Sequence, residues 1–184
     1  AIALAALPRK VAGFDSVEWL IIDDGCTDDT VQVAKRCGVD HIVSHTHNKG
    51  LAQGFMTGLA ACLELGADVI VNTDADNQYN ADDIPVLVDP IINGNAQIVI
   101  GARPIAAIEH FSPIKKALQK LGSTVVRWAS NTDIPDAPSG FRAITRDAAQ
   151  RLKVFNNYTC TLETIIQAGQ KNIAITSVPI RVNE

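Results

Sequence analysis

The stretch VEWLIIDDGCTDDT, residues 17–30, decides the fold class. Its first six residues form a nearly continuous apolar run, which is typical of a parallel strand covered on both faces. The run passes into Asp23, Asp24 and Gly25, a turn signal, and then into residues with helical spacing. Short apolar runs and helical stretches keep alternating along the chain, and this pattern predicts a βαβ organisation.

Further elements follow from the same reading. We expect strands at residues 17–22, 41–44, 68–72, 97–100 and 173–178. Helical spacing predicts helices at residues 3–7, 28–37, 51–65, 82–92 and 114–129. A helix at the very start normally follows a strand, so we expect a first strand to be missing. The prediction is one α/β domain over residues 1–184, truncated at the N-terminus, with truncation at the C-terminus left open.

The composition excludes several classes of protein. The 184 residues are 47% hydrophobic and 20% charged, with a net charge of -4, so we expect a folded core and no disorder. A weakly acidic chain lacks the basic field that general nucleic-acid binding needs. The four cysteines form no CxxC pair, which favours reduced thiols in a cytoplasmic protein. No apolar run reaches the roughly 18–20 residues of a membrane span.

Two acidic residues follow the apolar run at residues 68–72. Asp74 and Asp76 are two apart, and in extended backbone alternate side chains share one face, so both carboxylates can reach one cation. Hard oxygen ligands favour Mg²⁺ or Mn²⁺, and Gln78 can add an amide oxygen. The alternative is that either aspartate caps a helix or tightens a turn.

A second acidic pair, Asp23 and Asp24, ends the first expected strand. In an open parallel sheet, ligands bind beyond the carboxyl ends of the strands. There these side chains can accept hydrogen bonds from a base N–H or a ribose hydroxyl. The residues that follow favour structure instead, because Gly25 allows a tight turn and residues 27–29 suit a helix N-terminus.

Charged residues at later positions are further candidates. Arg103 follows a buried run and a glycine, where its guanidinium can bind a phosphate or form a surface ion pair. Asp136 and Arg142 stand at the ends of a turn that contains proline and glycine. Glu163 lies where a helix begins, and a negative charge there can simply interact with the helix dipole.

Other patterns carry less weight. His45 and His47 are interpreted as polar loop residues, because no third metal ligand lies near them in sequence. The G-x-G-x-x-G, Walker A and G-x-S-x-G motifs are absent, so dehydrogenase, P-loop and hydrolase functions lack support. The helix expected at residues 114–129 has an apolar stripe and a basic remainder, which suits either an anionic membrane surface or packing on its own domain.

Seven motifs occur in order along the chain: DDGCTDDT, NKGLAQGF, NTDADNQY, GAR, DAPSGFRA, YTCTLETIIQAG and VPIRVN. The series resembles the GT-A glycosyltransferases of family 2, and within them the dolichol- or polyprenyl-phosphate sugar synthase branch. The resemblance implies a Rossmann-like GT-A fold, with a mostly parallel central sheet and helices on both faces. The family's opening strand, with its Pro-x-Tyr-Asn-Glu motif, has no counterpart in this sequence.

The resemblance also implies how the donor would be held. Asp23 or Asp24 would bind the base of a nucleotide sugar. Asp74 and Asp76 would be the DxD pair at the ribose and at a Mg²⁺ or Mn²⁺ ion, with Gln78 as a further metal ligand.

For the acceptor, Arg103 and Arg142 would meet phosphates, and Asp136 would sit beside the acceptor. A phosphate acceptor is already an anion at neutral pH, whereas a sugar hydroxyl needs a general base, for which Asp136 and Glu163 are the candidates. The arginines and the basic helix favour a polyprenyl phosphate at the inner face of a membrane, and in-line attack would invert the anomeric centre. A sugar nucleotidyltransferase and a non-catalytic nucleotide-sugar binding domain are the alternatives.

Overall fold

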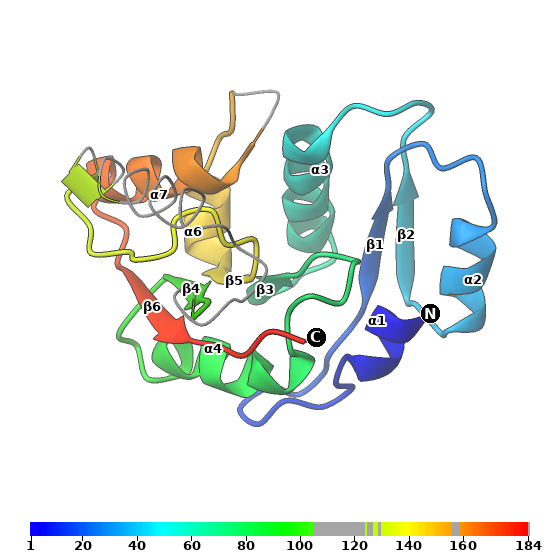
Figure 1. Cartoon of the computed structure of the whole chain (residues 1–184), viewed down its shortest axis with the longest axis horizontal. Coiled ribbons are helices and arrows are strands. Elements are labelled where there is room, and N and C mark those ends of the chain that lie inside the picture. Colours follow the sequence, from blue (N-terminus) through cyan, green and yellow to red (C-terminus); the bar gives the residue numbers. More distant parts are fainter. Residues whose placement is uncertain (105–123, 125–126, 129, 156–158, 184) are drawn as a thin grey trace.

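A computed structural model describes residues 1–104, 124, 127–128, 130–155 and 159–183. In chain order its elements are α1 (Ile2–Ala6), β1 (Leu20–Asp23), α2 (Thr30–Arg36), β2 (His41–Ser44), α3 (Leu51–Glu64), β3 (Val69–Asn72), the 3₁₀ helix η1 (Ala81–Asp83), α4 (Ile84–Ile92), β4 (Ile98–Ala102), β5 (Arg142–Thr145), α6 (Arg146–Arg151), α7 (Thr161–Gln170) and β6 (Ile175–Pro179). Strands and helices alternate through the first half of the chain, which confirms the α/β class (Figure 1).

The described strands form two sheets, whereas the sequence predicted one mostly parallel sheet. In the smaller sheet, β1 and β2 pair in parallel. The larger sheet has the order β3-β5-β4-β6, in which β5 runs antiparallel to both of its neighbours and β4 runs parallel to β6. The sheet is therefore mixed, because β5 enters between β3 and β4 after a long excursion of the chain.

Helices cover both faces of the larger sheet, as expected. Ile98 and Ile144 point to one face and join a core with side chains of α3, α6 and α7. Their strand neighbours, Val99 and Ala143, point to the opposite face and join a core with side chains of α4. This alternation within each strand explains why β4 is nearly all apolar and why Ala143 and Ile144 of β5 are both buried.

Most predicted elements agree with the structure to within a few residues, and β2 agrees at both ends. β5 and α6 were not predicted. Most of the helix expected at residues 114–129 lies outside the described residues. None of the helices in the described part is long and apolar enough to span a membrane. All four cysteines are free thiols.

Candidate active site

The carboxyl ends of β1 and β3 border one cavity with a volume of about 1570 Å³. Asp23 and Asp24, at the end of β1, and Asp74, just beyond β3, all line it. These are the three residues for which the sequence predicted nucleotide contacts. The position agrees with the general rule that ligands of open α/β sheets bind beyond the carboxyl ends of the strands.

Asp74 is a half-buried carboxylate in an unfavourable setting. Burial raises the pKa of Asp74, and the negative charge of Asp76 raises it further, while the charges of Arg103 and Arg142 act in the opposite direction. No ion pair involving Asp74 or Asp76 is found among the described residues. A carboxylate that is partly desolvated and next to a second carboxylate is stabilised by a cation placed between them.

The backbone around Asp74 leaves little free space. Gly140 lies so close that a Cβ atom there would come within 2.9 Å of Asp74 Oδ2. The Gly140 N–H donates to the Tyr79 hydroxyl at 2.9 Å, and the Asn72 side chain donates to the Gly140 carbonyl at 2.8 Å. The turn at residues 137–140 is thus held against the carboxyl end of β3, where it fixes the position of the Asp74 carboxylate.

A turn brings Asp76 beside Asp74, whereas the sequence predicted that extended backbone would do so. The strand ends at Asn72, and residues 75–76 form a turn, so the two carboxylates do not alternate along extended backbone. Asp76 is exposed, and its Oδ1 accepts from the Gln78 N–H at 2.9 Å. Asn77 takes a φ of 62°, which asparagine tolerates better than most residues.

The C-terminal segment supports this turn, which the sequence did not predict. The Asn183 N–H donates to the Gln78 carbonyl at 2.8 Å, and the Asn183 side chain donates to the Asn77 carbonyl at 2.8 Å. Asn183 lies in the VPIRVN motif, and that motif is therefore in contact with the acidic turn in three dimensions.

The acidic turn fits a weakly coordinated Mg²⁺ or Mn²⁺ ion. Among the described residues, no group of three or more His, Cys, Asp or Glu side chains could enclose a metal. Mg²⁺ commonly uses one or two carboxylates, with substrate phosphates and water completing its coordination. Asp74 and Asp76 would supply the carboxylates, and Gln78 lies in the same turn.

Asp24 holds the loop after β2 in place. Its Oδ1 accepts from the Lys49 N–H at 2.8 Å and lies 2.7 Å from His45 Nδ1, and its Oδ2 accepts from the Gly50 N–H at 2.8 Å. The hydrogen bond with His45 is the main cause of the lowered pKa of Asp24, and the bond from Lys49 adds to it. Asp24 therefore joins β1 to the N-terminus of α3.

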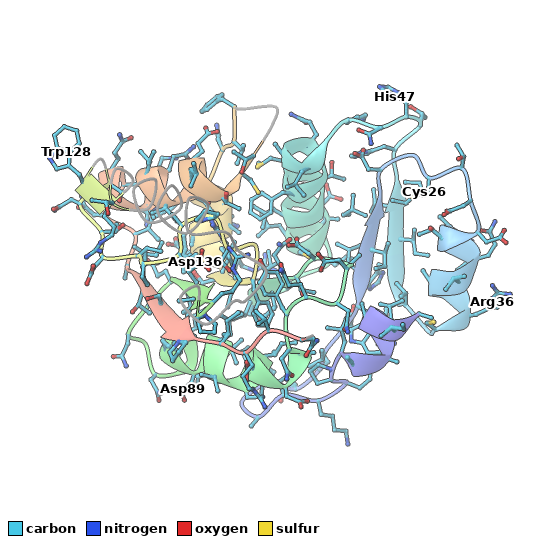
Figure 2. All side chains as sticks on the ribbon, in the orientation of Figure 1. Cys26, Arg36, His47, Asp89, Trp128 and Asp136 are labelled. Carbon is cyan, nitrogen blue, oxygen red and sulfur yellow. The ribbon has the colours of Figure 1, made fainter. Side chains whose placement is uncertain are left out.

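Asp23 makes the equivalent contact within its own turn. Its Oδ1 accepts from the Cys26 N–H at 2.8 Å, which is the main cause of its lowered pKa. Gly25 has a φ of +82°, and a Cβ atom there would lie 2.8 Å from the Asn48 backbone nitrogen. Glycine therefore lets the turns after β1 and β2 approach each other at the cavity edge. Figure 2 shows Cys26 and His47 at this end of the two strands.

His45 lies in the loop after β2, as predicted, and its side chain is buried. Its Nδ1 contacts Asp24, and its Nε2 lies 2.9 Å from the Thr57 hydroxyl of α3. Its position directly after a predicted strand was a usable signal, because residues at the carboxyl ends of neighbouring strands meet.

The Asp24 contacts predict a specific acid sensitivity. A carboxyl whose pKa is lowered by folding stabilises the protein above its unfolded pKa of about 4, and this contribution is lost as the pH falls through the folded pKa. We therefore expect Asp24→Asn to destabilise the protein at pH 7 and to have a smaller effect at pH 3. Melting temperatures of both proteins across this range test it. A difference in melting temperature between the two proteins that stays constant across this pH range would contradict the role given to the Asp24 contacts.

Arg103 and Asp136 form a buried ion pair with each other. Arg103 Nε donates to Asp136 Oδ2 at 2.7 Å, and one of its terminal nitrogens donates to Oδ1 at 3.0 Å. The Arg103 backbone N–H also donates to Oδ2 at 3.1 Å. Asp136 is 1% exposed and lies among interior side chains in Figure 2. The structure thus corrects its predicted role as a general base, because both of its oxygens are bound to Arg103.

Arg142 is buried, and its guanidinium is hydrogen-bonded to groups in the protein interior. It donates to the carbonyls of Ala137, Ser139 and Thr161 at 2.8–2.9 Å and to the Thr164 hydroxyl at 2.6 Å. Burial lowers its pKa to about 10. The guanidinium holds the turn at residues 137–139 to the start of α7, and its predicted contact with a phosphate would require breaking these bonds. We therefore correct its role to a structural one.

Glu163 lies away from the cavity that contains Asp74. Its carboxylate accepts from the Phe155 N–H at 3.0 Å and from the Gln167 side chain at 3.2 Å. It lines a separate cavity of about 570 Å³ beside α7. The expectation that Glu163 serves as a general base is therefore not supported by its position.

Of the basic helix, only the C-terminal part is described. Arg127 pairs with Asp133, and Trp128 is 87% exposed and points outward at the edge of the molecule (Figure 2). Residues 114–123 of the expected helix, which include its lysines, lie outside the described residues.

Comparisons with known proteins agree with this fold and site. The chain is 30% identical over 185 residues to the UDP-N-acetylglucosamine–dolichyl-phosphate N-acetylglucosaminyltransferase of Methanococcus voltae, covering 88% of this chain and 73% of that protein. It is 25% identical to the polyprenol monophosphomannose synthase of Mycolicibacterium smegmatis, covering 91% and 67%. These relatives confirm the resemblance to the polyprenyl-phosphate branch.

Among solved structures, the glucosyl-3-phosphoglycerate synthase of Mycobacterium tuberculosis in complex with UDP has a TM-score of 0.73 and 21% identity, covering 93% of this chain and 62% of that chain. The same enzyme with Mn²⁺, UDP and phosphoglyceric acid has a TM-score of 0.71. This chain thus spans about three fifths of the solved chains, and the likeness confirms the GT-A fold. Residues 3–153 match the family model "Glycosyl transferase family 2". Because that match covers most of the sequence, the chain belongs to glycosyl transferase family 2.

Proposed function

We propose that this protein moves a hexosyl group from a nucleotide-sugar donor to a polyprenyl phosphate, with inversion at the anomeric carbon and with a divalent cation at Asp74 and Asp76. The observation that carries the proposal is the position of Asp74. It is a half-buried carboxylate with a raised pKa, next to Asp76, on the wall of the cavity that Asp23 and Asp24 also line.

The donor would bind across the carboxyl ends of β1 and β3. Asp23 or Asp24 would accept hydrogen bonds from the base or the ribose, and the diphosphate would lie toward Asp74. Asp23 and Asp24 are each held by backbone N–H groups, so their oxygens are fixed before a ligand binds. Such preorganisation reduces the entropic cost of binding.

Asp74, Asp76 and Gln78 would hold the cation. When bound, Mg²⁺ or Mn²⁺ supplies positive charge that neutralises the diphosphate leaving group. The Mn²⁺ and UDP in the structures of the mycobacterial synthase support this choice of cofactor. Arg103 adds a nearby positive charge that is held in place by Asp136.

The choice of acceptor rests on the positions of the two carboxylates that were candidates for a general base. Asp136 is bound to Arg103, and Glu163 lines a different cavity, so neither carboxylate is placed to take a proton from a sugar hydroxyl. An acceptor phosphate needs no such base, since its second pKa is about 6 and it is already anionic at neutral pH. The names of the curated relatives point to the same acceptor class.

A lipid acceptor would place the protein at the inner face of a membrane, where the basic helix and the exposed Trp128 would make peripheral contact.

A turnover assay tests the proposal. Nucleotide sugars are incubated with the protein and Mn²⁺, with and without a polyprenyl phosphate. We expect a nucleoside diphosphate to be released, together with a glycosylated lipid, only when the lipid phosphate is present. Release of pyrophosphate would instead identify a sugar nucleotidyltransferase. Metal-dependent binding without turnover for any donor would identify a non-catalytic nucleotide-sugar binding domain.

Gly140→Ala tests the geometry of the cation site. The added methyl group would lie 2.9 Å from one Asp74 oxygen and 3.1 Å from the other, so the carboxylate must move. We expect the affinity for UDP in the presence of Mn²⁺ to fall by about tenfold, which is about 1.4 kcal/mol. Titration calorimetry measures this change.

The matched control is Gly54→Ala in α3, which lines the same cavity but whose new Cβ would make only an ordinary contact of 3.8 Å with Ile22. We expect no loss of affinity in the control and a gain in stability of about 0.5–1 kcal/mol, because alanine favours the helix. Equal affinities for all three proteins would contradict the placement of the cation beside Asp74.

A further inference from the structure

Tyr79 ends the motif NTDADNQY and is buried directly beside the acidic turn. Its side chain lies at the edge of the cavity and is only 5% exposed. The ring stacks on that of Phe141, with the two centroids 5.2 Å apart and the two planes at 16°. Both rings belong to the core on the α4 side of the larger sheet. Packing therefore fixes the position of the Tyr79 ring and, with it, of the hydroxyl.

The hydroxyl of Tyr79 both accepts and donates a hydrogen bond. It accepts from the Gly140 N–H at 2.9 Å. It also donates to the Asp74 carboxylate, since an ionised carboxylate can only accept. Burial has the largest influence on the pKa of Asp74 and raises it, whereas this hydrogen bond lowers it. The close approach of Gly140 to Asp74 Oδ2 places all three groups together.

The backbone of Tyr79 is held by the C-terminal segment. Tyr79 forms an antiparallel bridge with Val182, and the Asn183 side chain donates to the Tyr79 carbonyl at 3.2 Å. Arg181 anchors this segment to Asp83, whose carboxylate accepts from the Arg181 N–H at 2.6 Å and from its Nε at 2.9 Å. Because both ring and backbone are held, the hydroxyl is a fixed donor.

Packing alone does not require the hydroxyl. Phenylalanine would fill the same space and stack on Phe141 in the same way, because it differs from tyrosine only by one oxygen. In the described part of the chain, that oxygen contacts the Gly140 N–H and the Asp74 carboxylate. The hydroxyl therefore connects the turn at residues 137–140 to the carboxylate.

A neutral donor suits a carboxylate that must bind a cation. An arginine or a lysine in this place would form an ion pair with Asp74 and would compete with a metal for its charge. A hydroxyl holds the carboxylate in one orientation and leaves its negative charge available. Hydrogen bonds of this kind orient metal-binding side chains, and their loss typically lowers metal affinity by about 10–100-fold.

We propose that Tyr79 is a positioning residue for the cation site: its hydroxyl holds the Asp74 carboxylate in the orientation in which that carboxylate meets the divalent cation. The inference rests on the proposed function and adds a residue to it. Tyr79 acts through Asp74 and takes no part in the transfer itself.

Tyr79→Phe gives the first test, because it removes the hydroxyl and keeps the ring. We expect the affinity for Mn²⁺ at a saturating UDP concentration to fall by at least about tenfold. Electron paramagnetic resonance measures free Mn²⁺ and gives this affinity without reference to turnover. An affinity equal to that of the wild-type protein would overturn the inference.

The matched control is Thr145→Ala, which also removes one hydroxyl. Thr145 Oγ1 accepts from the Ala148 N–H at 3.2 Å at the start of α6. Thr145 pairs with Val69, at the end of β3 that lies away from Asp74. We expect loss of this cap to lower the melting temperature by roughly 2–4 °C and to leave the Mn²⁺ affinity unchanged. Equal losses of Mn²⁺ affinity in the two variants would contradict the inference, because stability alone would then explain them.

Amide exchange without metal or nucleotide checks the geometry. In Tyr79→Phe the Gly140 N–H loses its acceptor, so we expect its exchange to become at least about tenfold faster. The amide of Ile100, in the middle of β4, should keep its exchange rate and so report that the variant is folded. Unchanged exchange at Gly140 would show that the hydroxyl does not hold the turn, and the inference would fail.

A double variant separates a shared action on Asp74 from two independent effects. Gly140→Ala displaces the Asp74 carboxylate sterically, and Tyr79→Phe releases it. If both changes act on this one carboxylate, the double variant should bind Mn²⁺ no more than about threefold more weakly than the weaker single variant. Losses that multiply are the result expected of separate sites and would rule out the positioning role.

The wild-type protein distinguishes this inference from the proposed function. If it binds no Mn²⁺ in the presence of UDP, the proposed function fails, and the role of Tyr79 fails with it. If it binds Mn²⁺ and Tyr79→Phe binds equally well, only the role of Tyr79 is wrong. Should Tyr79→Phe not fold, Asn183→Ala takes its place, because it loosens the Tyr79 backbone and keeps the hydroxyl. Unchanged Mn²⁺ affinity in that variant would then decide against the inference.

Discussion

Asp76→Ala is expected to abolish the increase in melting temperature that Mn²⁺ and UDP together produce. At a ligand concentration 100 times the dissociation constant, binding adds about 2.7 kcal/mol to the stability of the folded state. For a chain of this size, that corresponds to a shift of roughly 5–10 °C. Without the Asp76 carboxylate, the cation keeps one fixed carboxylate ligand, and the nucleotide loses the charge that offsets its diphosphate.

Sugar transfer should fall with binding in this variant, by about a thousandfold, because the cation acts on charge that develops at the leaving group. The matched control is Asp89→Ala, which removes an exposed carboxylate from α4, away from the cavity (Figure 2). The control should keep both the temperature shift and the activity. A full shift in Asp76→Ala, or an equal loss in both variants, would contradict the assignment of the cation to the acidic turn.

Arg142→Met is expected to cost about 4 kcal/mol of folding stability. The change leaves three carbonyls and one hydroxyl without their donor in the protein interior, where each unpaired group costs about 1–3 kcal/mol. Part of that cost is offset because a buried charge is removed. The melting temperature should fall by roughly 10 °C, as measured by thermal or denaturant unfolding.

Arg36→Met is the control for charge removal. Arg36 is exposed in the last turn of α2, where a positive charge contributes only about 0.3–1 kcal/mol through the helix dipole (Figure 2). If Arg142→Met instead folds with unchanged stability and loses affinity for the donor or acceptor, then Arg142 binds a phosphate and its structural role here is wrong.

The elements that the sequence predicts well are those whose signal is local. β2 is a short apolar run between turn residues, and its predicted bounds agree with the structure at both ends. The end of β1 is equally clear, because the change from apolar residues to Asp23 marks the carboxyl edge of the sheet. Such signals also located the acidic residues that line the cavity.

β5 could not be predicted from the sequence, because a central strand that contains Arg142 is stable only through contacts with residues that are distant in the chain. A central strand that begins with arginine looks unfavourable in sequence. Arg142 is tolerated there because its donors meet carbonyls of residues 137 and 139 and groups of residues 161 and 164. The antiparallel direction of β5 also depends on the long connection between β4 and β5. The periodicity of apolar residues within a strand contains no information about the direction in which that strand pairs.

The pairing of Arg103 with Asp136 was not predicted for a related reason. Each is a reasonable ligand when it is considered alone, yet they lie 33 residues apart and bind each other in the folded chain. Pairing between side chains that are far apart in sequence has no local signal. The same holds for His45, whose partners Asp24 and Thr57 come from β1 and α3.

The central claim is that a divalent cation lies between Asp74 and Asp76 and faces a diphosphate in the cavity. Paramagnetic broadening by Mn²⁺ in amide NMR spectra tests it most directly. With UDP present, we expect the signals of residues 74–76 and of Gly140 to broaden strongly, while the signal of Asp89 stays sharp. Broadening that is independent of UDP and centred on another acidic segment, such as the exposed Asp28 and Asp29, would contradict the claim.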